Sequence, residues 1–298
     1  MLITGLHLLL TYQCTLECDH CFVWGSPRQS GTMSLAQVRD ILHQAQALGQ
    51  VTSIYFEGGE PFLYYSTLLA AVREAHALGF TVGIVSNGYW ATGLEDALEA
   101  LRPLAGLVQD LSISSDDYHW NTAVSQHVRH IRAAARRLGI PIGVLSIGQP
   151  GAGGAEASGQ LAPGESAVMY RGRAVEKLAR QAPLHAWDTF RCCPHEDLRE
   201  PGRVHVDPFG NVHLCQGLAL GNLFDTPLSV LCAGYDPEAH PIVGPLLAGG
   251  PTELVRCYGL PHQAGYADAC HLCDEARRRL RQRFPEALTP DQMYAVQP

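Results

Sequence analysis

The sequence predicts an α/β fold, in which a partial (β/α)6 TIM-like barrel precedes a small cysteine-rich α+β extension. The barrel is indicated by apolar strand patterns that alternate with amphipathic helix patterns. Five such units fill about the first 150 residues and a sixth follows, which is fewer than a closed eight-unit barrel needs. The extension is indicated by a change near residue 185, after which cysteines, prolines and short strand patterns dominate.

Each unit of the barrel has its own strand and helix pattern. The expected strands lie within residues 3–12, 51–61, 80–88, 107–117 and 140–148, and the expected helices within 34–49, 66–78, 94–104 and 124–139. The first helix shows the signal best, because Ser34 is a suitable N-cap and Gly49 a suitable stop. Four residues between them form one apolar face, namely Val38, Ile41, Leu42 and Ala45.

We expect two domains, a barrel over residues 1–182 and the extension over residues 183–298. Residues 148–165 are rich in Gly, Ala, Pro and Ser, which is typical of a flexible connection. The sixth strand–turn–helix unit is expected within residues 166–181. In the extension, residues 203–215 read as a hairpin, because two alternating runs flank an Asp-Pro-Phe-Gly-Asn turn.

Composition excludes several classes of protein. Apolar residues make up 46% of the 298 residues, so the chain can bury a large core, and the net charge of -8 argues against a broad nucleic-acid surface. The start lacks the charge and cleavage pattern of a signal peptide, and no apolar run is long enough to span a membrane. We therefore expect a cytoplasmic protein, where clustered cysteines point to metal or redox chemistry.

Three cysteines lie close together after the first strand, at Cys14, Cys18 and Cys21. Thiolates suit zinc and iron–sulfur clusters, but a closed zinc site needs four ligands. His20 is a poor fourth ligand because it directly precedes Cys21. The alternative is a [4Fe–4S] cluster held at three corners, whose fourth iron stays open to a substrate.

The CxxxCxxC spacing after a first strand, followed by "GGEP" at residues 58–61, resembles the radical S-adenosylmethionine (SAM) enzymes. The resemblance implies that Cys14, Cys18 and Cys21 hold a [4Fe–4S] cluster whose open iron binds SAM. It also implies reductive cleavage to a 5'-deoxyadenosyl radical, which takes a hydrogen atom from a substrate. Such chemistry needs an electron donor such as flavodoxin or ferredoxin.

The same resemblance assigns cofactor-binding residues at the ends of strands. Gly58 and Gly59 allow close backbone approach, and the Glu60 carboxylate is expected to meet the methionine ammonium. Ser86 and Asn87 end the third strand, and Ser112 and Ser114 end the fourth. His20 matches the position that the family uses near the adenine; the alternative is an exposed loop histidine.

The later cysteines resemble the SPASM and twitch extensions of this family, and Gly172-Arg173-Ala174 is also typical of that subgroup. Their order departs from the two-cluster SPASM pattern, so we expect one auxiliary [4Fe–4S] cluster. Its expected ligands are Cys193, Cys215, Cys270 and Cys273. Cys193 is preferred over Cys192 because a proline follows it. Zinc at the same four thiols is the alternative, and Cys232 and Cys257 are expected to be buried apolar thiols.

Several charged residues have two possible roles. Four residues follow the fourth strand and either face a substrate or cap the next helix, namely Asp116, Asp117, Tyr118 and His119. Arg171 and Arg173 follow the sixth strand and either bind a carboxylate or form structural ion pairs. The arginines between residues 277 and 283 are expected to form a solvated helix surface.

The expected substrate is a peptide or protein side chain, which would be crosslinked, epimerised or oxidised, as auxiliary-cluster relatives often do. We expect no peptide-recognition segment before Cys14, in which case a leader-dependent enzyme would need a separate recognition protein. One alternative is a radical SAM enzyme that acts on a small metabolite. The other is a non-catalytic protein that uses its cysteines for structural zinc or iron–sulfur binding.

Overall fold

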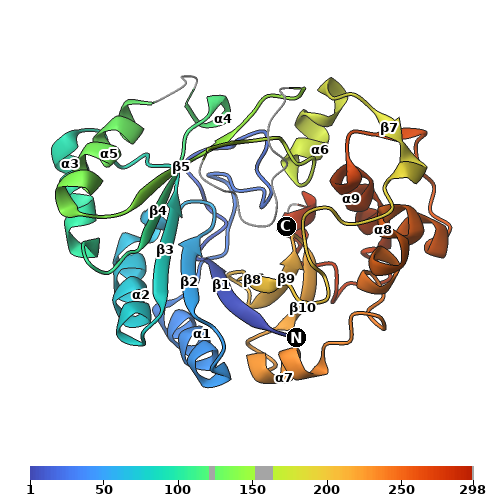
Figure 1. The fold of residues 1–298 in the computed structure, drawn as a ribbon, viewed down its shortest axis with the longest axis horizontal. Coiled ribbons are helices and arrows are strands. Elements are labelled where there is room, and N and C mark those ends of the chain that lie inside the picture. Colours follow the sequence, from blue (N-terminus) through green and yellow to red (C-terminus); the bar gives the residue numbers. More distant parts are fainter. Residues whose placement is uncertain (121–124, 152–163, 297–298) are drawn as a thin grey trace.

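The computed structural model describes residues 1–120, 125–151 and 164–296, and it is built around one nine-stranded sheet (Figure 1). The strand order is β10-β9-β8-β1-β2-β3-β4-β5-β6. The strands are β1 Ile3–Leu9, β2 Ser53–Glu57, β3 Thr81–Ser86, β4 Asp110–Ser114, β5 Ile142–Ile147, β6 Gly164–Ser166, β8 Gly202–Val206, β9 Asn211–Cys215 and β10 Leu218–Asn222. Pairing is parallel from β8 through β1 to β6 and antiparallel from β8 to β10. Within the described residues, β10 and β6 are the two edges, so the sheet stays open.

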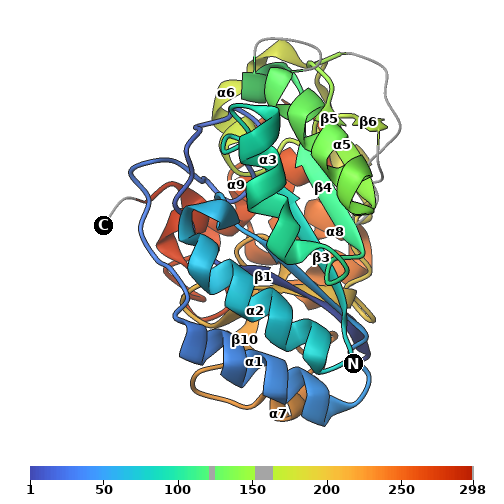
Figure 2. The same ribbon diagram turned by 90° about the vertical axis from the view of Figure 1, so that its left-hand side faces the viewer.

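Helices cover the outer face of the barrel strands, as Figures 1 and 2 show. These are α1 Leu35–Leu48, α2 Tyr65–Ala77, α3 Leu94–Leu101 and α5 Gln126–Leu138. The shorter helices are α4 Asp117–Trp120, α6 Arg173–Lys177, η1 Pro61–Tyr64, η2 Arg102–Leu104, η3 Ala179–Gln181, η4 Trp187–Thr189 and η5 Asp291–Tyr294. The five predicted strands and the four predicted helices of the barrel are confirmed.

The first helix begins and ends where the sequence predicts. The Ser34 hydroxyl accepts a hydrogen bond from the backbone N–H of Gln37, whose side chain bonds back to Ser34 in a capping box. Gly49 ends the helix in the left-handed region at φ 75°. The four residues of the predicted apolar face are each 0% exposed.

The two faces of the parallel sheet carry different side chains. On the helix-covered face, Leu6, Ile54 and Ile84 are fully buried, in the alternation that a strand imposes. On the inner face, His7, Glu57 and the β4 serines line a cavity. A packed barrel interior would carry branched apolar residues at such positions, so this polar face marks a site.

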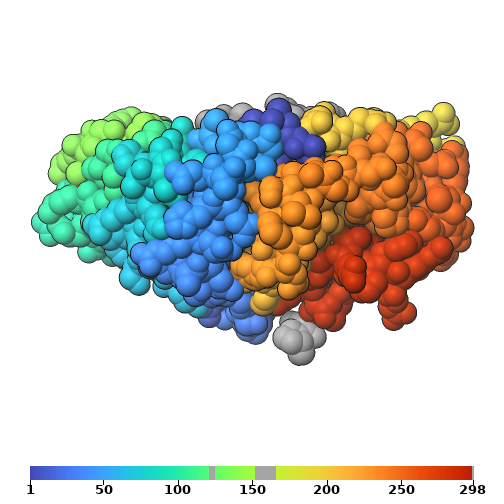
Figure 3. Space-filling view, turned by 90° about the horizontal axis from the view of Figure 1, so that it is seen from below, coloured from blue at the N-terminus to red at the C-terminus, as the bar shows by residue number. Residues whose placement is uncertain are grey.

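The extension continues the barrel sheet instead of standing apart from it. β8 pairs with β1, with His205 opposite His7, although almost 200 residues separate them. The predicted hairpin is confirmed as β8–β9, and its buried Asp207 accepts a hydrogen bond of 2.9 Å from the hydroxyl of Tyr12, in the loop after β1. Figure 3 shows the two halves of the chain in continuous contact on one face. A domain boundary near residue 182 stays a prediction.

The sixth unit is shorter than expected. β6 begins at Gly164, inside the segment 148–165 that we expected to be a flexible connection, and residues 152–163 of that segment lie outside the described residues. The helix of this unit, α6, spans only Arg173–Lys177. It ends early, and 3-10 helix η3 follows within two residues.

The remaining extension is mostly helical. Helices α8 Val243–Tyr258 and α9 Ala269–Leu280 pack together, and α9 contacts a two-stranded sheet of β7 His185–Ala186 and β11 Gly265–Tyr266. Helix α7 Leu228–Gly234 packs against α1. The helix expected around the arginines of residues 277–283 is confirmed as α9, whereas α7 and α8 were not predicted. A kink interrupts α8 at Gly249 and Gly250. Among the described residues, no helix has the length and apolar character needed to cross a bilayer.

Candidate active site

A cavity of about 190 Å³ opens on the inner face of the sheet, at the carboxyl ends of the parallel strands. The loop after β1, the turns after β2 and β3, and strands β4, β5 and β8 all contribute to its wall. The predicted site residues that line it are Cys14, Cys18, His20, Cys21, Gly58, Gly59, Ser86, Asn87, Ser112 and Ser114. Of the residues predicted for this site, Glu60 does not line the cavity.

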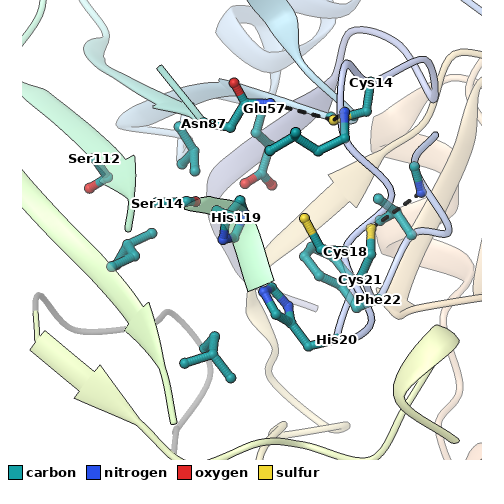
Figure 4. Close-up of a pocket in the computed structure, with 18 of the residues that line it drawn as sticks. Cys14, Cys18, His20, Cys21, Phe22, Glu57, Asn87, Ser112, Ser114 and His119 are labelled. Atoms are coloured by element: carbon teal, nitrogen blue, oxygen red, sulfur yellow. Dashed lines mark hydrogen bonds between the residues drawn. The ribbon is translucent and has the colours of Figure 1, made fainter. Parts of the chain in front are cut away.

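The three cysteines of the loop after β1 lie on one side of the cavity (Figure 4). Burial raises the pKa of the Cys14 thiol to about 12, and burial together with the neighbouring thiols raises that of Cys18 further. A bound cation would reverse this, since thiolates are the metal-binding form. Among the residues that line the cavity there is no fourth cysteine.

Hydrogen-bond donors already surround the sulfurs. The backbone N–H of Leu16 donates to Cys14 Sγ at 3.4 Å, and that of Gly25 donates to Cys21 Sγ at 3.2 Å. Asn87 Nδ2 donates to Cys14 Sγ at 3.5 Å (Figure 4). Such donors stabilise cluster thiolates and tune their potential. The donor set therefore fits an iron–sulfur cluster that is held by three thiolates and has one position open to the cavity.

Glu60 lies behind the cavity wall and joins two strand ends. Its carboxylate is 0% exposed and accepts hydrogen bonds from the Ser86 hydroxyl at 2.9 Å and from the backbone N–H groups of Asn87 at 2.8 Å and Phe62 at 3.0 Å. We expected this carboxylate to meet a ligand ammonium. In this placement it instead fixes the turn after β2 against the end of β3, where Asn87 faces the sulfurs.

Glu60 predicts a pH dependence of stability. Burial raises the pKa of its carboxyl to about 7, although the hydrogen bonds from Asn87, Phe62 and Ser86 oppose this. The folded state then binds more protons than the unfolded state between pH ~4.5 and ~7, so stability falls as the pH rises through that range. We expect denaturant unfolding of Glu60→Gln to lose this component, on the order of 3 kcal/mol. An unchanged pH profile in the variant would contradict it.

The two glycines after β2 let the backbone approach the cysteine loop. Gly58 lies at φ 145°, and a Cβ on Gly59 would meet the Gln13 carbonyl oxygen at 2.1 Å. The Gly59 N–H donates to the Thr11 carbonyl at 2.6 Å. The turn thus packs directly against the backbone that leads into Cys14, and there is no room for a side chain between the turn and that backbone.

Gly59→Ala is expected to destabilise the fold by about 2 kcal/mol or more, because backbone must move to admit the methyl group. Denaturant unfolding under anaerobic conditions measures this. Gly234→Ala is the matched control, since a Cβ there meets nothing within 4 Å. Equal stability of the two variants would show that the turn is not packed as described.

Asp116 caps the helix after β4 and also lines the cavity. Its Oδ1 accepts hydrogen bonds from the backbone N–H of Tyr118 at 3.1 Å and of His119 at 3.2 Å, which caps α4. The same oxygen lies 2.7 Å from His119 Nδ1, and both residues line the cavity. Burial alone would raise the Asp116 pKa, but the hydrogen bond with His119 and the nearby His20 imidazole lower it well below its usual range.

His20 is not an exposed loop residue. It lines the cavity, its side chain is 16% exposed, and its Nε2 lies 3.7 Å from Asp116 Oδ2. Its ring meets the Tyr118 ring edge-on, with the centroids 4.8 Å apart. This places an aromatic group beside the cysteines, as the sequence predicts, and its contact with an adenine stays a prediction.

A second polar group, which the sequence analysis missed, lies on the same inner face. Glu57 Oε1 is 3.1 Å from His7 Nδ1 and 3.0 Å from His205 Nε2. Burial would raise the Glu57 pKa, but the two imidazoles hold it well below its usual range, and burial lowers the pKa of His205 to about 4. The available signal was a polar residue at an inward position in each of two apolar strands, β1 and β2.

The four predicted auxiliary ligands lie around one small pocket of about 30 Å³. They are Cys193, Cys215, Cys270 and Cys273. Cys192 is exposed and does not line this pocket, in agreement with the preference for Cys193. Cys232 is buried as expected, but the expectation for Cys257 is wrong, because it is exposed at the end of α8.

Two buried arginines face these cysteines. Arg171 and Arg277 both line the pocket, and the Nε of each is buried without a hydrogen-bond partner. Arg171 Nη1 lies 4.0 Å from Cys215 Sγ. The expected solvated surface is therefore wrong for Arg277, which is 3% exposed. Cys270, Cys273 and Arg277 are spaced three and four residues apart, so one face of α9 brings them together.

The motif at residues 172–174 holds the cysteine loop. Arg173 Nη1 donates to the Cys18 carbonyl at 2.7 Å and Nη2 donates to the Gly25 carbonyl at 2.8 Å. Gly172 lies at φ 60°, and a Cβ there would meet the Phe22 backbone at 2.7 Å. Arg173 is thus a structural clamp, whereas Arg171 lines both the large cavity and the small pocket.

Known proteins resemble part of this chain. The putative peptide biosynthesis protein YydG of Bacillus subtilis is 27% identical over 129 residues, which is 43% of this chain and 40% of that protein. An S-adenosylmethionine-dependent nucleotide dehydratase of Fibrobacter sp. is 25% identical over 122 residues, which is 39% of this chain and 34% of that protein. The aligned parts thus span two fifths or less of these relatives.

A solved structure shares the fold over most of the chain. Streptococcus suis SuiB bound to its precursor peptide SuiA superimposes with a TM-score of 0.60, covering 90% of this chain and 76% of SuiB at 12% identity. The model of the radical SAM superfamily matches residues 8–156, which is half of the chain and contains the whole cysteine loop and the ends of β2 to β4. The chain therefore belongs to the radical SAM superfamily.

Proposed function

We propose that Cys14, Cys18 and Cys21 hold the [4Fe–4S] cluster that this family uses, and that SAM binds at its open position. The observation that carries the proposal is the convergence of three thiols and the ends of β2, β3 and β4 on one cavity that no fourth cysteine lines. When bound, the cluster and SAM supply a 5'-deoxyadenosyl radical, which takes a hydrogen atom from the substrate. The electron comes from a flavodoxin or a ferredoxin.

The residues of this chain position these groups. The Gly58–Gly59 turn offers backbone to the methionine end of SAM, while Ser112 and Ser114 offer hydroxyls from β4 (Figure 4). Glu60 positions this wall by holding the backbone N–H of Asn87. His20, held against Tyr118, supplies the ring beside the adenine. The buried wall excludes water from the radical.

We further propose that residues 183–298 carry one auxiliary [4Fe–4S] cluster on Cys193, Cys215, Cys270 and Cys273. The two arginines support this. Only the Nε of each guanidinium lacks a partner, because Arg277 Nη1 donates to the Gln216 carbonyl and Arg171 Nη1 lies 3.6 Å from Glu196. Two buried positive charges beside the four cysteines would balance a cluster with four thiolates, whose net charge is about −2. Zinc with four thiolates has the same net charge, so metal analysis separates the two.

The proposed substrate is a peptide or protein side chain. The support is the likeness to YydG, which is named for peptide biosynthesis. A small metabolite is the second candidate, because the chain is also similar to a nucleotide dehydratase. In either case the substrate must reach the cavity floor, where His7, Glu57 and His205 lie.

Anaerobic reconstitution tests the proposal. We expect about eight irons per chain and, with SAM and a reductant, release of 5'-deoxyadenosine. Cys273→Ser should lose about four irons yet keep SAM cleavage, since its pocket is separate. Retained zinc without cleavage would support the non-catalytic alternative. Mass spectrometry of candidate peptides, for loss of two hydrogens or for deuterium uptake from D2O, tests the peptide substrate; modification of metabolites alone would contradict it.

A further inference from the structure

Two imidazoles and a carboxylate meet on the floor of the cavity. They offer nitrogen and oxygen donor atoms, whereas both groups of cysteines offer sulfur. His7, Glu57 and His205 come from β1, β2 and β8, three neighbouring strands of the sheet. One donor atom from each lies within 4.8 Å of the other two. Figure 4 shows the Glu57 side chain directed into the cavity.

The spacing of these donors suits a shared ion. The distances from Glu57 Oε1 are 3.1 Å to His7 Nδ1 and 3.0 Å to His205 Nε2. An ion about 2.1 Å from each donor separates neighbouring donors by about 3.0 Å at right angles and about 3.4 Å at tetrahedral angles. Direct hydrogen bonds give similar distances, so a binding measurement has to separate the two.

The three side chains are held in place before any ligand arrives. His7 stacks on Tyr55 with the ring centroids 4.6 Å apart, and the Tyr55 hydroxyl donates to Asp110 at 2.9 Å. The His205 ring packs edge-on against His7 and against Phe22. Donors on rigid strands with packed rings form a preorganised site.

The group is also open on one side, and among the described residues Glu57 forms ion pairs with the two histidines and not with Arg171 or Arg203, which line the same cavity. The side chains of Glu57 and His205 are 12% and 14% exposed, toward the cavity that they line. Arg203, on the same strand as His205, donates to Glu196 at 3.4 Å. An ion here would keep coordination positions directed at the cavity, as catalytic metal sites do.

We propose that His7, Glu57 and His205 bind one divalent first-row metal ion, whose open positions hold an oxygen atom of the substrate. Two imidazoles and one carboxylate, with no sulfur, suit ions such as Fe²⁺, Zn²⁺ or Mn²⁺. The substrate part rests on the proposed function, because it takes the cavity as the reaction site. Binding of the ion itself does not depend on SAM cleavage.

Mn²⁺ tests this, because its free and bound forms are distinguished by electron paramagnetic resonance (EPR) and it has little affinity for thiolates. The anaerobically reconstituted protein is expected to bind one Mn²⁺ per chain. Glu57→Gln, which keeps the shape of the side chain, and His205→Asn should each weaken binding at least tenfold. His43→Ala, on the exposed side of α1, is the matched control and should bind as the wild type does.

Pulsed EPR gives the ligands directly. The bound Mn²⁺ should show coupling to imidazole nitrogen, and the coupling should weaken in His205→Asn. Absence of Mn²⁺ binding in the wild type, or equal binding in Glu57→Gln and His43→Ala, would overturn the proposal. Mn²⁺ binding by a protein that never cleaves SAM would count against the proposed function and leave the metal site standing. SAM cleavage without Mn²⁺ binding would overturn the metal site and leave the proposed function standing.

Discussion

Cys18→Ser is expected to abolish release of 5'-deoxyadenosine and to remove about four irons per chain. The reason lies in the geometry of the loop after β1. Only three thiols line the cavity, so losing one leaves two corners of the cluster held. A serine hydroxyl is a harder and far less acidic ligand than a thiol and does not replace it. Iron analysis and chromatography of the SAM products measure both effects.

Cys257→Ser is the control for this variant, because Cys257 is exposed at the end of α8 and lines neither pocket. It should retain the iron and the cleavage rate of the wild type. A Cys18→Ser protein that still cleaves SAM at a tenth of the wild-type rate or more would contradict the assignment of this loop.

Arg173→Ala is expected to release the cysteine loop from the rest of the fold. The guanidinium is 2% exposed and its two donors hold the carbonyls of Cys18 and Gly25, one on either side of Cys21. Its loss leaves the buried Gly25 carbonyl without a partner, while the Cys18 carbonyl keeps only the hydrogen bond from the Cys21 N–H, which costs about 1–3 kcal/mol. We expect lower unfolding stability and poor iron incorporation at the first site, with the auxiliary site still filled.

Arg180→Ala provides the comparison, since Arg180 is exposed on η3, a few residues along the chain. Arg173→Lys sharpens the test, because one ammonium group does not reproduce the fork that spans two carbonyls. If Arg173→Ala kept a full first cluster and wild-type stability, the motif at residues 172–174 would have no part in holding the loop.

The strand–helix alternation predicted the barrel because each element is specified by its own local period. The same period could not predict that β8 pairs with β1. That pairing joins segments almost 200 residues apart, and no local sequence feature of either strand identifies the strand with which it pairs. The kinked helix α8 was also missed, because Pro251 and the two glycines before it weaken the local signal for a helix.

The site could be predicted to a large extent because the carboxyl ends of parallel strands meet at one edge of a sheet. Motifs at the ends of β1, β2, β3 and β4 therefore had to come together. The direction in which a single side chain points could not be predicted in this way. Glu60 follows two glycines in a turn, where no alternation fixes the side on which it points, and its partners Ser86 and Asn87 lie on another strand.

The site residues that the sequence analysis missed are those whose role depends on residues far away in the chain. In the sequence, His7 is a single histidine in an apolar strand. Its role follows only from the fold, in which β8 places His205 opposite it. In the sequence, Arg277 is one of a run of arginines. In the fold, α9 places it with Cys273 at the pocket that both line. In both cases tertiary structure, and not local pattern, decides whether a polar residue is solvated or part of a site.

The most direct test of the central claim is the EPR spectrum of the first cluster, measured in a Cys270→Ser/Cys273→Ser protein that lacks the second. After anaerobic reconstitution and reduction, the account predicts a [4Fe–4S]⁺ signal that changes when SAM is added, because one iron is free to bind it. A signal that is identical with and without SAM, or a protein that holds zinc in place of iron at Cys14, Cys18 and Cys21, would contradict the account.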